Sequence, residues 1–286
     1  MSGARRGGRA VPVELVVTDL DGTLSDARER VHPASARAVR ALQAAGVPVL
    51  LATGRRPRTA ATVLRGARLQ VPAVVLDGAL GLDLPSGRVF HRARFPDGAA
   101  AAVLRAFTDA GVSPCVYVDR PGVDYVVGRR PSTNPAHLAR SPNVLVVDDL
   151  ESLVAGEPVQ TFAVIGRPAA LLEPVARAVG AAGSASVVAD LVYGGATLQV
   201  RPLGVSKWSG VLAFCADRGL DPTRVLAVGD GANDLELLEA ASVACSVAGA
   251  NPAALARADH VIGPPDLGGW AAIPALAGVD GNGRRR

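Results

Sequence analysis

Cysteine, aromatic residues and long apolar runs are all scarce in this 286-residue sequence, and each scarcity excludes some classes of protein. The three cysteines, Cys115, Cys215 and Cys245, form neither a CxxC pair nor a Cys/His metal-binding spacing, so we expect unpaired thiols in a reducing compartment. No apolar run reaches the length that spans a bilayer, and the arginine-rich "MSGARRGGRAV" is not followed by the apolar h-region of a signal peptide. We therefore expect a cytoplasmic protein without a membrane partner.

The formal net charge of +4 does not indicate a nucleic-acid partner. Part of it lies in "ARRGGR" and "GRRR", and we expect residues 1–11 and 280–286 to be disordered tails. Elsewhere the arginines are interspersed with acidic residues, and there is no recognisable RNA-binding aromatic motif or helix-turn-helix. We therefore expect no nucleic-acid partner.

Lysine is almost absent. Lys207, in "RPLGVSKWSG", is the only lysine among 30 basic residues. Because a compact ammonium and a planar guanidinium are not interchangeable, a position that keeps lysine against this bias is a candidate functional residue. The competing interpretation is that Lys207 is a chance survivor of the bias.

Short apolar runs alternate with amphipathic stretches at both ends of the chain. Strands are expected at 13–20, 47–54 and 72–78, separated by helices at 34–46 and 58–67. This β-α-β-α-β order is typical of a parallel sheet with crossover helices. The same rhythm returns near the end, with strands expected at 224–231, 242–247 and 259–263 and helices at 205–219, 233–241, 251–258 and 268–276.

The middle of the chain has a different pattern. From about residue 80 to about 200, seven strand-like runs are interrupted by helical stretches at 97–111 and 169–183, the second of which contains Pro174. In "VDRPGVDY", Pro-Gly lies between two strand-like runs, which predicts a hairpin. These features predict a separate α+β domain inserted into the α/β domain.

Two acidic clusters follow apolar strands. Asp19 and Asp21 end the strand in "VELVVTDLDGTLSD", and in "AVGDGANDLE" Asp230 ends another strand while Asn233 and Asp234 open the next helix. Ligands of parallel α/β sheets bind at the carboxyl ends of strands, and clustered carboxylates call for a cation. All-oxygen coordination favours Mg²⁺, whereas an EF-hand is excluded because glycine follows the second aspartate directly and a strand precedes it.

Thr53 and Gly54 close the second strand in "LLATGR". A hydroxyl followed by glycine at a strand end offers a side-chain donor and backbone amides to a phosphate oxygen, although such a pair is more often a simple turn. Lys207 would add a point charge that neutralises a nucleophilic carboxylate and an incoming phosphate.

Four motifs, "DLDGT", "TGR", "GVSK" and "GDGANDLE", occur in that order at strand ends or helix starts, and together they resemble those of the haloacid dehalogenase (HAD) superfamily. The long insertion between the second and third motifs is similar to a C2-type cap. The segment "SVACSVAGANPAALARADHVI" resembles the Cof-type phosphatase branch, subclass IIB. The resemblance implies a Rossmann-like core made of residues 1–82 and 199–286 and a cap made of residues 83–198.

The resemblance also implies the roles of the core residues. Asp19 would be the nucleophile that forms an aspartyl-phosphate, and Asp21 would be the general acid and then the base. Mg²⁺ would be held by Asp19, the backbone carbonyl of Asp21, and Asp230. Asp234 would not bind the metal itself but would orient Lys207 or metal-bound water. The groups implied to bind the phosphoryl oxygens are Thr53, the Gly54 amide, Lys207 and Asn233. Arg55 would contact the substrate or the cap, with an exposed salt bridge as an equally weighted alternative.

The expected function is a Mg²⁺-dependent phosphatase for a small phosphorylated metabolite such as a sugar or polyol phosphate, acting as a monomer or weak homodimer. A sugar phosphomutase with a similar core and a non-catalytic metabolite-binding or regulatory protein are the alternatives. Two positions depart from the family pattern: Asp77, where relatives commonly have asparagine, and Trp208, which follows the lysine. A carboxylate at position 77 that faces the substrate would disfavour a second phosphate and favour polyol or amino groups.

Overall fold

The computed structural model describes residues 12–190, 192–280 and 284–285. The chain divides into two compact units: unit 1 takes its residues from 1–51, 63–71 and 215–286, and unit 2 from 52–62 and 72–214. The tail expected at 1–11 lies outside the described residues, as do 281–283 and 286. Within the second expected tail, the amide of Asp280 donates to the carbonyl of Arg284.

Unit 1 is built on parallel strands in the order β14-β13-β12-β1-β2. Their bounds are β1 Leu15–Thr18, β2 Val49–Ala52, β12 Val225–Gly229, β13 Val243–Val247 and β14 His260–Ile262. All residues of β1 and β12 are buried, which agrees with their continuous apolar sequences. The parallel sheet expected from the sequence is therefore present.

The helices of unit 1 follow the expected alternation with strands. They are α1 Pro33–Ala44, α8 Leu235–Ala240, α9 Pro252–Leu255 and α10 Ile273–Leu276. Two helices, α2 (Pro57–Gly66) and α7 (Lys207–Arg218), contribute residues to both units. The helices expected at 251–258 and 268–276 are shorter than the sequence pattern predicts, and a 3₁₀ turn at Gly269–Ala272 precedes α10.

Unit 2 contains a six-stranded sheet in the order β10-β11-β9-β6-β7-β8, in which only the β7–β8 pair is parallel. The bounds are β6 Cys115–Val118, β7 Tyr125–Gly128, β8 Val144–Val147, β9 Val159–Arg167, β10 Ser184–Ala189 and β11 Ala196–Arg201. The antiparallel β6–β7 pair confirms the hairpin predicted around Pro-Gly.

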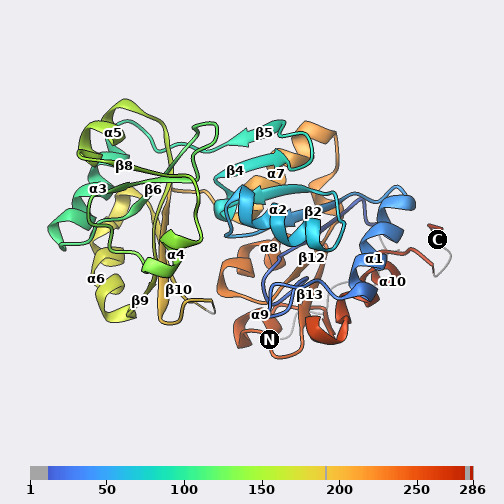
Figure 1. The fold of residues 1–286 in the computed structure, drawn as a ribbon. Helices are drawn as coiled ribbons and strands as arrows, with labels where there is room; N and C mark the ends of the chain where they lie inside the picture. Colours follow the sequence, from blue (N-terminus) through green and yellow to red (C-terminus); the bar gives the residue numbers. More distant parts are fainter. Residues whose placement is uncertain (1–11, 191, 281–283, 286) are drawn as a thin grey trace, which may run out of the picture. The chain divides into compact units, whose positions relative to one another are not determined.

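Three helices cover one face of this sheet (Figure 1): α3 (Ala99–Asp109), α5 (Leu150–Gly156) and α6 (Ala169–Val179). Their apolar residues share one core with the sheet, including Phe107 and Phe162. The helix α6 continues through Pro174, as predicted, because its apolar face is buried in that core. A further short helix, α4, spans Pro135–Ala139.

Unit 2 also holds an antiparallel ladder of β3 (Pro72–Val75), β4 (Leu80–Asp83) and β5 (Val89–Arg92). The sequence analysis did not anticipate β4. The strand β5 falls in the segment assigned to the inserted domain, and its hydrogen-bonded partner is β4. The predicted boundaries of core and cap stay a prediction.

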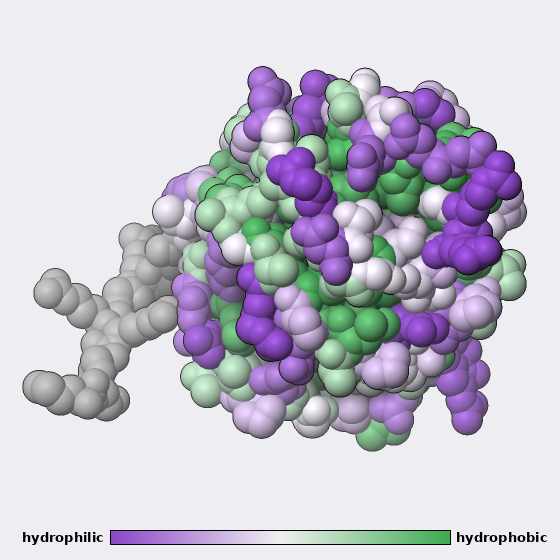
Figure 2. Space-filling view, turned by 90° about the vertical axis from the view of Figure 1, so that its left-hand side faces the viewer, coloured by the Kyte–Doolittle hydropathy of each residue, from purple (hydrophilic) through white to green (hydrophobic). Residues whose placement is uncertain are grey.

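Hydrophilic and hydrophobic side chains are interspersed on the face that Figure 2 shows. Large apolar side chains reach the surface of unit 2 at scattered positions such as Val146 and Val192. Within 12–190, 192–280 and 284–285, none of the helices combines the length and apolarity that crossing a membrane would require. The three cysteines are free, as expected, and all three are buried.

Candidate active site

Asp19 follows the last residue of β1, at the carboxyl end of the parallel sheet of unit 1. Its backbone amide donates to the carbonyl of Val228 in β12 at 2.9 Å, and its residue exposure is only 6%. The parallel register pairs Thr18 with Val228, so Asp19 and the residues after β12 leave the sheet side by side. The strand adjacency on which the metal-site prediction depends is therefore present.

A tight turn after Asp19 shapes the second side of the site. The carbonyl of Leu20 accepts hydrogen bonds from the amides of Leu24 and Ser25 at 3.0 and 2.7 Å. Gly22 has φ +79°, and a Cβ at this position would lie 2.6 Å from Oδ2 of Asp230. Only glycine therefore satisfies both the left-handed backbone and the close approach of this carboxylate.

Two further contacts fix the second acidic cluster. The Thr23 hydroxyl donates to Oδ1 of Asp230 at 2.7 Å. The fully buried Asp234 accepts hydrogen bonds through Oδ2 from the amides of Asp230 and Gly231, at 3.1 and 2.9 Å. Asp234 thus fixes the turn that carries Asp230. Gly22 and Thr23 are contributors that the sequence analysis did not single out, although both stand in the "DLDGT" motif.

The carboxylates of Asp19, Asp230 and Asp234 form a candidate metal centre. Each offers one oxygen, and the three oxygens lie within 4.8 Å of one another. Several carboxylates held this close repel one another unless a cation compensates them, and hard oxygen donors are the ligands that Mg²⁺ takes. These residues fit a divalent oxygen-liganded ion. The Asp21 side chain is not one of the three groups, and the role predicted for its backbone carbonyl stays a prediction.

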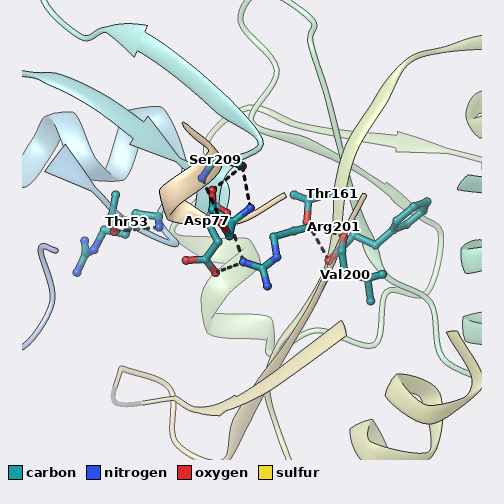
Figure 3. Close-up of polar contacts among 9 residues, drawn as sticks. Thr53, Asp77, Thr161, Val200, Arg201 and Ser209 are labelled. Carbon is teal, nitrogen blue, oxygen red and sulfur yellow. Dashed lines mark hydrogen bonds and ion pairs between the residues drawn. The ribbon is translucent and has the colours of Figure 1, made fainter. Parts of the chain in front are cut away.

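In unit 2, Thr53 and Gly54 form a turn that is tied to the segment after β3. The amide of Thr53 donates to the carbonyl of Val74 at 2.9 Å, and the amide of Asp77 donates to the carbonyl of Thr53 at 3.1 Å. Thr53 is 1% exposed, and its hydroxyl accepts a hydrogen bond from the amide of Arg55 at 3.2 Å. Figure 3 shows Asp77 between Thr53 and Arg201.

Lys207 is the first residue of α7, and it is 1% exposed. The start of the helix is fixed by Ser206 and Ser209, because each of these serines accepts a hydrogen bond from the other's backbone amide, at 3.2 and 3.0 Å. A fully buried ammonium is uncommon unless other groups compensate its charge. Burial therefore favours a functional lysine over a chance survivor.

The structure groups the predicted site residues within each unit. Asp19, Asp230 and Asp234 come together in unit 1, where Asn233 lies half-buried in the 3₁₀ turn at Ala232–Asp234. Unit 2 holds Thr53, Gly54, the half-buried Arg55, and the buried Lys207. The catalytic and binding roles of these residues stay predictions.

Unit 2 contains a buried polar cluster that the sequence analysis missed. An Arg56 Nη atom lies 3.2 Å from a carboxylate oxygen of Asp124, and its guanidinium carbon lies 5.3 Å from the ring centre of Tyr125. His137 stacks on Tyr125 at 5.3 Å. Burial, reinforced by the charge of Arg56, lowers the pKa of His137 to about 4, and burial raises the pKa of Tyr125 to about 12. No periodicity in the sequence marks these residues.

Comparison with known proteins agrees with this architecture. A family model for haloacid dehalogenase-like hydrolases matches residues 16–272. A phosphoglycolate phosphatase of Methanopyrus kandleri is 28% identical over 251 residues, covering 87% of this chain and 90% of its own. A pyridoxal phosphate phosphatase of Escherichia coli is 24% identical over 269 residues, covering 87% and 93%.

Solved structures share the fold. A sugar phosphatase of HAD subclass IIB superimposes with a TM-score of 0.73 at 19% identity, covering 92% of this chain and 98% of its own. The parallel sheet, the acidic cluster at the strand ends and the family match all agree with the resemblance drawn from the four motifs. The chain therefore belongs to the haloacid dehalogenase-like hydrolases, as a phosphatase with the fold of their subclass IIB members.

Proposed function

We propose that this phosphatase hydrolyses the phosphate monoester of a small metabolite, of the sugar or polyol phosphate class, through an aspartyl-phosphate on Asp19 and with Mg²⁺ as cofactor. The observation that supports this most is the convergence of Asp19, Asp230 and Asp234 at the carboxyl ends of β1 and β12. Such a cluster needs a cation, and a nucleophilic carboxylate beside a cation stays ionised.

The metal would be held by Asp19, Asp230 and the backbone carbonyl of Asp21. When bound, Mg²⁺ supplies positive charge that offsets the repulsion between the carboxylates and the phosphoryl group. Asp234 does not need to bind the ion to matter, because its hydrogen bonds to the amides of Asp230 and Gly231 hold the turn in place.

The chemistry divides into two steps on the protein's own carboxylates. A carboxylate oxygen of Asp19 attacks phosphorus, the bond between phosphorus and the leaving oxygen breaks, and Asp21 donates a proton to the leaving alcohol. Asp21 then takes a proton from water, whose oxygen attacks the phosphorus of the aspartyl-phosphate. Inorganic phosphate leaves and Asp19 is regenerated as a carboxylate. No oxidant or reductant is required.

The phosphoryl oxygens would be bound by Thr53, the Gly54 amide, Lys207 and Asn233, with Arg55 contacting the rest of the substrate. The burial of Thr53 and Lys207 supports this assignment, because a buried hydroxyl and ammonium are strong ligands for an anion in a low-dielectric site. The α+β cap, expected at 83–198, would contact the leaving group. The proposal for sugar or polyol phosphates agrees with the activity of the subclass IIB neighbour, whereas the relative from Methanopyrus acts on phosphoglycolate.

The test is release of inorganic phosphate from p-nitrophenyl phosphate by the purified chain. We expect turnover with Mg²⁺, loss of turnover with EDTA, recovery when Mg²⁺ is added back, and a loss of at least about a thousandfold in Asp19→Asn. Asp26→Asn is the matched control, because Asp26 caps the backbone of the same loop through the amides of Arg28 and Arg30 and should keep wild-type turnover. Turnover by Asp19→Asn, or indifference to EDTA, would refute the proposal.

A further inference from the structure

The segment after β3 adopts an unusual backbone that places a carboxylate beside the Thr53–Gly54 turn. Leu76 and Asp77 have φ +52° and +49°, a left-handed backbone conformation that residues other than glycine seldom adopt. The amides of Leu76 and Asp77 donate to the carbonyls of Arg55 and Thr53 at 2.9 and 3.1 Å. These bonds tie the strained turn to both residues that flank Gly54.

The carboxylate of Asp77 lies directly against Gly54. A Cβ on Gly54 would be 3.2 and 3.3 Å from the two carboxylate oxygens of Asp77, and Asp77 is 4% exposed. A buried negative charge is therefore in contact with the turn that we propose as part of the phosphate site. Such a charge disfavours additional anionic groups nearby and needs a cation to compensate it.

Arg201, at the end of β11, supplies that cation. One Nη atom donates to the backbone carbonyl of Asp77 at 3.3 Å and lies 3.8 Å from its carboxylate (Figure 3). Arg201 is 8% exposed, and its buried Nε makes no hydrogen bond to any residue that the structure describes. A buried donor without a partner is costly, so this N–H is available to a group that joins the site.

We propose that the Asp77–Arg201 pair determines which leaving group the phosphatase accepts. The pair combines an anionic acceptor with an unused N–H donor, a set that matches hydroxyl groups, which donate and accept at once. The pair disfavours a carboxylate or second phosphate on the leaving group beside it, because Asp77 already offsets the charge of Arg201 and no positive charge of the pair is left to compensate another anion. This inference rests on the proposed function and makes it specific: a neutral polyol or sugar monophosphate is preferred over an anionic analogue.

Glycerol 3-phosphate and 3-phosphoglycerate test the pair, because the first carries a neutral CH₂OH group at the position where the second carries a carboxylate. We expect kcat/KM of the wild-type enzyme to favour glycerol 3-phosphate by about tenfold or more, and Asp77→Asn to reduce that ratio by about tenfold. Asparagine is nearly isosteric with aspartate and tolerates the left-handed backbone, so folding should be retained. A second variant, Arg201→Gln, leaves Asp77 without this cation and should raise the ratio.

The control is Asp83→Asn, which removes a carboxylate at the end of β4 that pairs with Arg88 and should leave the ratio unchanged. A ratio in Asp77→Asn within twofold of the wild-type value would overturn the inference, as would p-nitrophenyl phosphatase activity without turnover of glycerol 3-phosphate. Absence of any phosphate release by the wild-type enzyme refutes the proposed function instead, so the two failures are distinguishable.

Discussion

Replacing Gly22 with alanine should disable the enzyme while leaving most of its stability intact. The new Cβ would lie 2.6 Å from Oδ2 of Asp230, closer than Cβ atoms approach other heavy atoms, and 3.1 Å from its Cγ, which is a tight contact. Either the turn or the Asp230 carboxylate must move, and Asp230 is also held by the Thr23 hydroxyl at 2.7 Å. The candidate metal centre would therefore lose its geometry.

The magnitude has two parts. An alanine at φ +79° costs about 1–2 kcal/mol of folding free energy, because its Cβ crowds the carbonyl oxygen in the left-handed region. The catalytic part is larger, because a displacement of about 1 Å in a reacting or metal-binding group can cost about 100-fold in rate. We therefore expect kcat/KM to fall by about 100-fold and the Mg²⁺ concentration for half-maximal activity to rise.

The matched control is Gly46→Ala. Gly46 also has a left-handed backbone, φ +73°, but nothing lies within 4 Å of a Cβ at that position. Both variants should lose a similar amount of free energy of unfolding, measured by chemical denaturation, and only Gly22→Ala should lose activity. If the two variants keep activities within about threefold of each other, the reasoning about Asp230 is refuted.

Two further predictions concern Lys207 and His137. Lys207→Arg should lose most of its p-nitrophenyl phosphatase activity, because a planar guanidinium does not fit the place of an ammonium that is 1% exposed. The control Arg218→Lys, at the other end of α7, should keep wild-type activity. Wild-type turnover by Lys207→Arg would contradict the role assigned to this lysine. The pKa of His137 is about 4 in the folded protein and 6.5 in the unfolded chain, so the unfolded chain binds more protons between these pH values. The free energy of unfolding should therefore fall as pH is lowered from 6.5 to 4. His137→Phe keeps a ring against Tyr125 and should flatten this dependence in denaturation experiments at a series of pH values; an unchanged slope would exclude His137 as its source.

Much of the architecture was predictable because it follows from local patterns. The strands β1 and β12 have continuous apolar sequences, because both faces of a parallel sheet are covered. Their parallel pairing places Asp19 beside the residues after β12. The helix α6 was predicted in spite of Pro174, because its apolar face repeats at helical spacing. The strand β4 was missed, since Leu80–Asp83 is short and contains a glycine.

By itself, the sequence determined the order of the elements and the positions of the acidic motifs, because burial periodicity and strand-end residues are local properties of the chain. Only the tertiary structure decided which atoms meet: Thr23 donates to Asp230 across 207 positions, and Arg201 reaches Asp77 across 124. The same holds for the close approach of Asp230 to Gly22 and for the stacking of His137 on Tyr125. Contacts of this kind depend on side-chain direction and packing between distant segments, and no periodicity along the chain specifies them.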